Sequence, residues 1–168
     1  MTNPALFQTM ARYNAWMNGK VYDVAATLSD EDRKADRGAF FGSLHATLDH
    51  ILWGDRAWMN RLASRDYPIG PLGAPLYDDF DALRVARGEA DADILAWTEA
   101  LTPEWLAGTY EWSSVVYQRD FAHPRWGLVQ HMFNHQTHHR GQITTLLSQA
   151  GLDVGATDMP FGPIWADS

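Results

Sequence analysis

Residues 130–142 read Gln-His-Met-Phe-Asn-His-Gln-Thr-His-His-Arg-Gly-Gln, and this segment holds four of the chain's seven histidines. Pro124 precedes the segment and Gly151 follows it, as is typical of the two ends of a helix. Between these ends only two glycines, Gly127 and Gly141, disfavour a helix, and isolated glycines are tolerated there. We therefore predict one long helix over residues 124–150.

The histidines of this helix fall mainly on one face. At about 100° per residue, His131, His135 and His139 lie on consecutive turns, and His138 lies just to one side. Apolar residues share that face, so these histidines are expected to point toward the interior. The alternative is a set of helical histidines that are exposed or hydrogen-bonded in the core.

Imidazoles four residues apart on a helix can both reach one divalent metal ion, as they do in the H-E-x-x-H zinc helix. The present segment lacks the glutamate of that motif, so only the spacing is shared. The spacing allows either His131 with His135 or His135 with His139 as the ligand pair. His135 belongs to both pairs.

Composition limits the classes of protein to consider. A chain of 168 residues suits a single domain, here residues 1–168, and its formal net charge of −8 argues against a nucleic-acid-binding surface. The sequence has no cysteine, which excludes disulfides and thiolate ligands and fits a reducing compartment. No membrane span or signal peptide is recognisable, so we expect a cytoplasmic protein. The eight tryptophans suggest an aromatic cavity or a dimer contact.

Four segments have the apolar periodicity of bundle helices, namely residues 5–28, 44–65, 79–101 and 124–150. Residues 66–77 are rich in proline and glycine and are expected to form an ordered loop. Residues 109–121, which include Val115 and Val116, alternate like a strand, and the tail at 152–168 is expected to pack back onto the helices. The expected fold class is therefore all-α, a four-helix bundle with a short β segment before the last helix.

Two features of the middle helices depend on helical phase. Ser43 is a plausible N-cap of the second helix, and His45 and His50 both lie about 110° from the centre of its apolar stripe, on opposite sides. Phase alone therefore does not decide which of these two histidines faces inward. The acidic residues scattered along residues 79–101 are interpreted as a solvated outer face.

Three segments together resemble the DinB-like (DinB/YfiT-type) family of metalloenzymes, and the resemblance extends over essentially the whole chain. The first is Tyr-Asn-Ala-Trp-Met-Asn at residues 13–18. The second is Phe-Phe-Gly-Ser at 40–43, which leads into Thr-Leu-Asp-His-Ile-Leu-Trp-Gly-Asp-Arg at 47–56. The third, Asn-His-Gln-Thr-His-His-Arg-Gly-Gln at 134–142, is the most specific.

The resemblance implies a four-helix bundle with an unusual connection order, a homodimer, and one divalent metal held by three histidines. By position in the family's motifs, the resemblance implies that these ligands are His50, His135 and His139. It thereby favours His50 over His45, and the pair His135 and His139 over the pair His131 and His135. His131, Gln142 and Asn14 are implied to line the site or to orient its ligands, and Asp49 and Asp55 are further candidates for the second role. Three imidazoles suit zinc or nickel and leave coordination positions open, as in catalytic sites.

The function implied by the resemblance is a metal-dependent enzyme acting on a small molecule. It is either a transferase that uses an external low-molecular-weight thiol or a hydrolase. The alternative is a stress-related protein that binds a metal or a small ligand without turnover.

Overall fold

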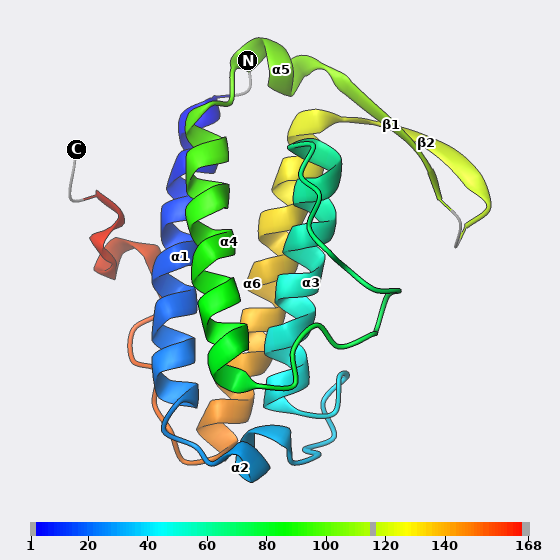
Figure 1. The fold of residues 1–168 in the computed structure, drawn as a ribbon. Coiled ribbons are helices and arrows are strands. Elements are labelled where there is room, and N and C mark those ends of the chain that lie inside the picture. Colours follow the sequence, from blue (N-terminus) through cyan, green and yellow to red (C-terminus); the bar gives the residue numbers. More distant parts are fainter. Residues whose placement is uncertain (1–2, 115–116, 166–168) are drawn as a thin grey trace.

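Four long helices form the body of the computed structural model, which describes residues 3–114 and 117–165 (Figure 1). They are α1 (Pro4–Ala25), α3 (Leu44–Leu62), α4 (Phe80–Glu99) and α6 (Arg125–Gln149). The shorter elements are α2 (Asp30–Lys34), α5 (Pro103–Ala107), β1 (Thr109–Ser114), β2 (Arg119–Pro124), and the 3-10 turns η1 (Met159–Phe161) and η2 (Pro163–Trp165). Among the described residues, no helix combines the length and the apolar character needed to cross a membrane. The predicted helical bundle is confirmed.

The connection order of the bundle is unusual. Helix α1 packs against α4 and α6, and α3 packs against the same two helices. The neighbours α3 and α4 begin at the same end of the bundle, so residues 63–79 must return along its full length (Figure 1). This loop has no helix or strand, as predicted. Helix α6 likewise begins at the same end as α1.

The helix ends differ from the predicted ones for local reasons. Helix α1 ends at Ala25 rather than at residue 28, and the Arg33 guanidinium donates hydrogen bonds to the carbonyls of Ala25 and Leu28 there. Helix α3 ends at Leu62 because Ser64 adopts a left-handed φ of 52°, which no helix continues. The predicted N-cap, Ser43, is confirmed, since its Oγ accepts a hydrogen bond from the Ala46 amide at 3.1 Å.

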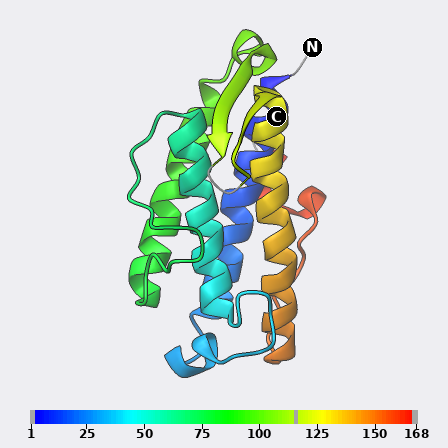
Figure 2. The same ribbon diagram turned by 90° about the vertical axis from the view of Figure 1, so that its right-hand side faces the viewer.

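The short β segment is confirmed as an antiparallel hairpin of β1 and β2. Trp112 lies opposite Phe121, and Tyr110 lies opposite His123. Val115 and Val116, which were part of the predicted strand, lie outside the described residues. Figure 2 shows the hairpin at the start of α6, on the side of the bundle formed by α3 and α6.

The C-terminal tail packs against the bundle, as expected. The Tyr13 hydroxyl on α1 donates a hydrogen bond to the Thr157 carbonyl at 2.8 Å. The turn η2 contacts α1, and its Ile164 side chain is buried. These contacts attach residues 157–164 to the face of α1.

The interior holds two apolar clusters, one toward each end of the bundle. The first includes Met17, Leu48, Leu83 and Ile143, and the second includes Phe7, Met59, Ile94 and Phe133. Buried polar side chains from all four long helices lie where the two clusters adjoin, and along α3 and α6 they fall between the two clusters in sequence. We call these residues the polar layer: Asn14, Asn18, Asp55, Arg87, Asp91, Gln136 and Arg140.

The polar layer is linked by a continuous series of contacts. Asp55 is its centre, because Arg87 and Gln136 each donate a hydrogen bond to one of its carboxylate oxygens. Arg87 also forms an ion pair with Asp91 at 2.9 Å, and Asp91 accepts a hydrogen bond from Asn18. On the other side, Arg140 donates to Gln136 and to Asn14.

The burial of Asp91 contradicts the expectation that the acidic residues of this segment form a solvated face, since its side chain is only 8% exposed. The expectation was wrong here because Arg87 and Asn18 neutralise and bind the carboxylate inside the bundle. Arg87, one turn earlier on the same helix, is also buried. The exposed acidic residues of α4, such as Asp81 and Glu89, fit the original interpretation.

Candidate metal centre

Three histidines meet between α3 and α6. His50 comes from α3, and His135 and His139 come from consecutive turns of α6. The Nε2 atom of His135 lies 3.2 Å from Nε2 of His50 and 3.1 Å from Nε2 of His139. One ring nitrogen from each residue falls within 4.8 Å of the others, so the group could hold a metal ion.

Helical phase explains how these side chains come together. The buried face of α6 is centred on Val129, Met132, Gln136 and Ile143, and the histidines lie at its edge, toward α3. His139 is therefore buried and His135 half-buried, whereas His131 and His138 are exposed. The prediction that His131 points toward the interior is wrong for this reason.

A glycine allows the close approach of His135 to α3. A Cβ atom on Gly54 would lie 2.7 Å from Cε1 and 3.2 Å from Nδ1 of His135. Carbon atoms in contact normally lie about 3.5–4.0 Å apart. Any side chain at position 54 would therefore push the imidazole away from the position that it now occupies. Gly54 lies in the interior of α3, where a glycine caps nothing and disfavours the helix. A glycine at such a position suggests close packing against a neighbour, and this was the signal that the sequence offered.

Neighbouring groups orient the rings. Gln142 Oε1 lies 2.8 Å from Nδ1 of His139. With a carbonyl oxygen as acceptor, Nδ1 carries the proton and the Nε2 lone pair is left for a ligand. The Phe41 ring stacks on His50 with centroids 3.9 Å apart, and Trp53 lies parallel to His50 at 6.4 Å. Sequence reasoning assigned no role to these two aromatic residues.

All three imidazoles favour the neutral form. Burial lowers the pKa of His50 to about 4 and the pKa of His135 to about 3, and neighbouring histidines add to both shifts. Burial also lowers the pKa of His139, although the bond to Gln142 opposes this effect. Neutral imidazole is the form that binds a metal ion, so no proton has to be displaced at neutral pH.

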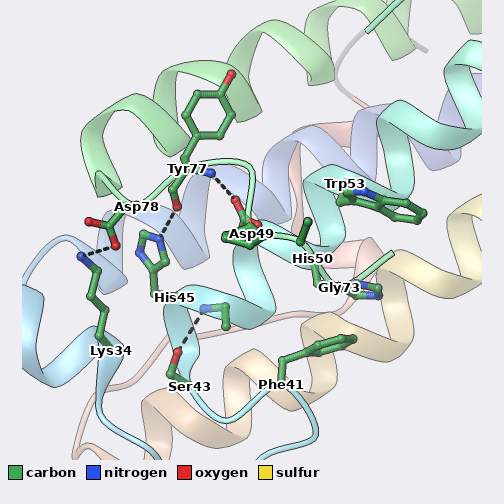
Figure 3. A pocket seen from close by; sticks show the side chains of 13 residues that line it. Lys34, Phe41, Ser43, His45, Asp49, His50, Trp53, Gly73, Tyr77 and Asp78 are labelled. Carbon is green, nitrogen blue, oxygen red and sulfur yellow. Dashed lines mark hydrogen bonds and ion pairs between the residues drawn. The ribbon is translucent and has the colours of Figure 1, made fainter. Parts of the chain in front are cut away.

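A cavity of about 290 Å³ opens beside His50 (Figure 3). Its walls are formed by α3 and by the returning loop, and Phe41 and Trp53 lie on its rim. Asp49 is the buried carboxylate of this cavity. Both of its oxygens accept backbone hydrogen bonds, from the amides of Leu76 and Tyr77 at 2.8 and 2.9 Å. Asp49 therefore holds the loop in place and does not contact the histidines.

The other candidate residues lie apart from the three histidines. His45 donates a hydrogen bond from Nε2 to the Tyr77 carbonyl of the returning loop at 2.8 Å. Its partner is therefore the loop, whereas His50 joins the histidine cluster, and helical phase alone could not predict this difference. Asn14 and Asp55 belong to the polar layer, where they bind Arg140 and Arg87. His131 lies 6.2 Å from His135 between ring centroids and packs against Trp58 at 5.2 Å.

The fold and this cluster define a class of helical-bundle proteins with a three-histidine site that could bind a divalent metal. Comparison with known sequences agrees, because a model of the DinB family matches residues 1–167. The chain belongs to the DinB family.

Individual relatives support this assignment. "Protein DinB" of Bacillus subtilis (strain 168) is 23% identical over 155 residues, which cover 87% of each chain. The uncharacterized protein YrdA of the same organism is 36% identical over 150 residues, 83% of this chain and 80% of that one. A solved DinB-like protein from Bacillus cereus ATCC 10987 superposes with a TM-score of 0.62 at 19% identity, covering 84% of this chain and 90% of that one. This last likeness supports the fold.

Proposed function

We propose that this protein is a metal-dependent enzyme in which His50, His135 and His139 hold one divalent ion, zinc or nickel. The observation that carries the proposal is the separation of the ring nitrogens, 3.1 and 3.2 Å for the two Nε2 pairs. Ligands bound at 2.0–2.1 Å in a tetrahedron are about 3.3–3.4 Å apart. Two of the three nitrogen pairs thus lie close to the spacing that a shared ion requires, and all three nitrogens lie within 4.8 Å of one another.

The donor set supports the same proposal. Three neutral imidazoles suit zinc and nickel better than magnesium or calcium, which prefer oxygen ligands. A metal ion held by only three protein ligands has open positions and supplies Lewis acidity, which acidifies a bound water or thiol or polarises a carbonyl. The protein's own part is to hold the His139 ring in its tautomer, through Gln142, and to shield one side of the site with Phe41.

For the reaction, we propose either transfer of an external low-molecular-weight thiol or hydrolysis of a small molecule. The chain has no cysteine, so any thiol must be a cosubstrate. Asp49 is bound to the loop amides and is not free to act as a general base, which makes thiol transfer the better candidate. Binding without turnover is the competing function.

The metal site is tested by elemental analysis of the untagged protein and two ligand variants, His50→Ala and His139→Ala. His138→Ala is the matched control, because this exposed histidine adjoins His139 on the same helix. We expect about one zinc or nickel ion per chain in the wild type and the control, and loss in both ligand variants. Metal retained in either ligand variant would refute the site.

The catalytic part of the proposal needs a separate test. Metal-loaded protein is assayed for transfer of several thiols to electrophiles and for hydrolysis of esters and amides, beside His135→Ala. Turnover that the variant lacks supports an enzyme. Saturable ligand binding with no turnover across the panel supports the binding function instead.

We also propose a homodimer, on the basis of family membership. Sedimentation at micromolar concentration tests this, and a monomer mass would refute it.

A further inference from the structure

A second, larger hollow lies beside the histidine cluster, between the hairpin and the paired helices α3 and α6. Its volume is about 520 Å³, and we call it the aromatic groove. Its apolar walls are mainly rings and aliphatic side chains: Trp53, Trp58, Leu72, Trp112, Phe121 and Leu128. Trp58 on α3 meets Trp112 on β1 edge to face, with centroids 6.4 Å apart, so the hairpin forms a true wall of the groove.

The groove lies next to the histidine cluster, although none of the three clustered histidines lines it. Trp53 lines both the groove and the cavity beside His50, and it lies parallel to the His50 ring. On the opposite wall His131 lines the groove one helical turn before His135. A ligand that enters the groove therefore approaches the cluster along both helices.

The charge of the groove differs from that of the whole protein. The chain has a net charge of −8, yet the residues that line the groove include Arg61, His123 and His131 and no aspartate or glutamate. Arg61 lies over the Trp58 ring at 5.3 Å and uses Nη1 to donate to the Ala57 carbonyl. Within residues 3–114 and 117–165 it forms no ion pair with a carboxylate. Its remaining N–H groups are available to an anion.

The length of the groove limits the size of its ligand. Arg61 follows Trp53 by eight residues on α3, which is about 12 Å along the helix at 1.5 Å per residue. A body of two fused rings with a carboxylate would extend over most of this distance. With its charge at Arg61, its other end would face the histidine cluster.

We propose that the aromatic groove binds a flat, apolar organic anion of about this size, with its carboxylate held by Arg61 and its rings between Trp58 and Trp112. Binding of such an anion in the groove does not depend on the proposed function. Only its role as the substrate of the histidine site rests on that function. Aromatic walls also suit organic cations. The guanidinium over Trp58 and the lack of a lining carboxylate disfavour that class.

The test measures binding to metal-free protein by calorimetry, so that a failure of the metal proposal does not affect it. Three probes share one body and differ in charge: 2-naphthoate, 2-naphthalenemethanol and 2-naphthylmethylammonium. We expect 2-naphthoate to bind at least about tenfold more tightly than the other two, since hydrogen bonds to a charged group contribute that much to affinity. Arg61→Gln should remove this preference and leave binding of the alcohol unchanged.

Two control variants separate local from general effects. Arg12→Gln removes an exposed arginine on α1, and Trp126→Ala removes a tryptophan that is 45% exposed outside the groove. Both should bind 2-naphthoate as the wild type does, whereas Trp112→Ala should weaken all three probes. Tighter binding of the ammonium probe, an unchanged preference in Arg61→Gln, or no binding of any probe at millimolar concentration would overturn the proposal.

Discussion

Replacing Gly54 by alanine is the sharpest test of how the histidine site is built. The new Cβ would lie 2.7 Å from Cε1 of His135, whereas such contacts need about 3.5 Å. The imidazole must then move by about 0.8 Å, which exceeds the roughly 0.5 Å within which a functional site has to be held. Removing a hydrogen bond that orients a metal ligand typically weakens metal affinity 10–100-fold. Displacing the His135 ring itself should weaken metal affinity at least as much.

The fold should tolerate the same change. Alanine favours a helix over glycine by about 1 kcal/mol, and displacement of one half-buried ring costs about 1–3 kcal/mol. We expect the free energy of unfolding of the metal-free protein to fall by at most about 2 kcal/mol. Urea unfolding measures this quantity, and titration against a competing chelator measures the metal affinity.

Gly141→Ala is the matched control for this experiment. Gly141 lies on α6 two residues after His139, and a Cβ there would meet nothing within 4 Å. The control should keep full metal affinity and gain up to about 1 kcal/mol of stability. If Gly54→Ala bound metal as tightly as Gly141→Ala, the assignment of His135 as a ligand through close packing on Gly54 would be refuted.

Three further outcomes are expected. Gln142→Ala should weaken metal binding about 10–100-fold in a chelator competition without unfolding the protein, because the hydrogen bond to His139 Nδ1 fixes the tautomer of that ring. A metal affinity equal to that of the wild type would exclude this role of Gln142. The free energy of unfolding of the metal-free protein, measured with urea, should fall as the pH drops from about 6.5 toward 4. The pKa values of His50 and His135 in the folded protein, about 4 and about 3, lie below the ordinary value, so the unfolded chain binds more protons in this range. A stability that does not change with pH would contradict the prediction. Arg87→Ala should destabilise the fold by about 3–5 kcal/mol, because it leaves the buried carboxylate of Asp55 without its cation, and a loss below about 1 kcal/mol would show that the polar layer does not need this pair.

The sequence predicted the helices and the β segment well because each depends on local patterns. Apolar residues recur at helical spacing in all four long helices, and Ser43 has the chemistry of an N-cap. The helix ends were less accurate, since they depend on backbone angles and side-chain contacts just beyond each helix. Arg33, for example, donates a hydrogen bond to the carbonyl of Ala25, the last residue of α1.

The site could be predicted from the sequence only in part. Spacing indicated a histidine site on α6, but helical phase could not choose between His45 and His50. The difference between them is made by the returning loop, which brings the Tyr77 carbonyl to His45. Tertiary contacts of this kind leave no periodic signal in the chain.

The polar layer was missed for a related reason. Charged residues on α4 look like an outer face when only their own helix is considered. Their burial depends on partners from other helices, such as Asn18 and Asp55. The spacing of Arg87 and Asp91, four residues apart, was the only local indication of an ion pair.

The polar layer also fixes the relative positions of the long helices, and so limits which parts of the protein can accept substitutions. A slide of α6 along α3 by one residue would part Gln136 from Asp55 and leave one oxygen of a buried carboxylate without its hydrogen bond, at a cost of about 1–3 kcal/mol. The relative position of His50 and His135 is therefore protected by residues that never touch a ligand. Part of the wall of the cavity beside His50 comes from the returning loop, and part of the wall of the aromatic groove comes from the hairpin, and these two segments carry none of the layer's residues. Substitutions in those two segments can thus alter ligand preference over evolutionary time while the histidine cluster keeps its geometry.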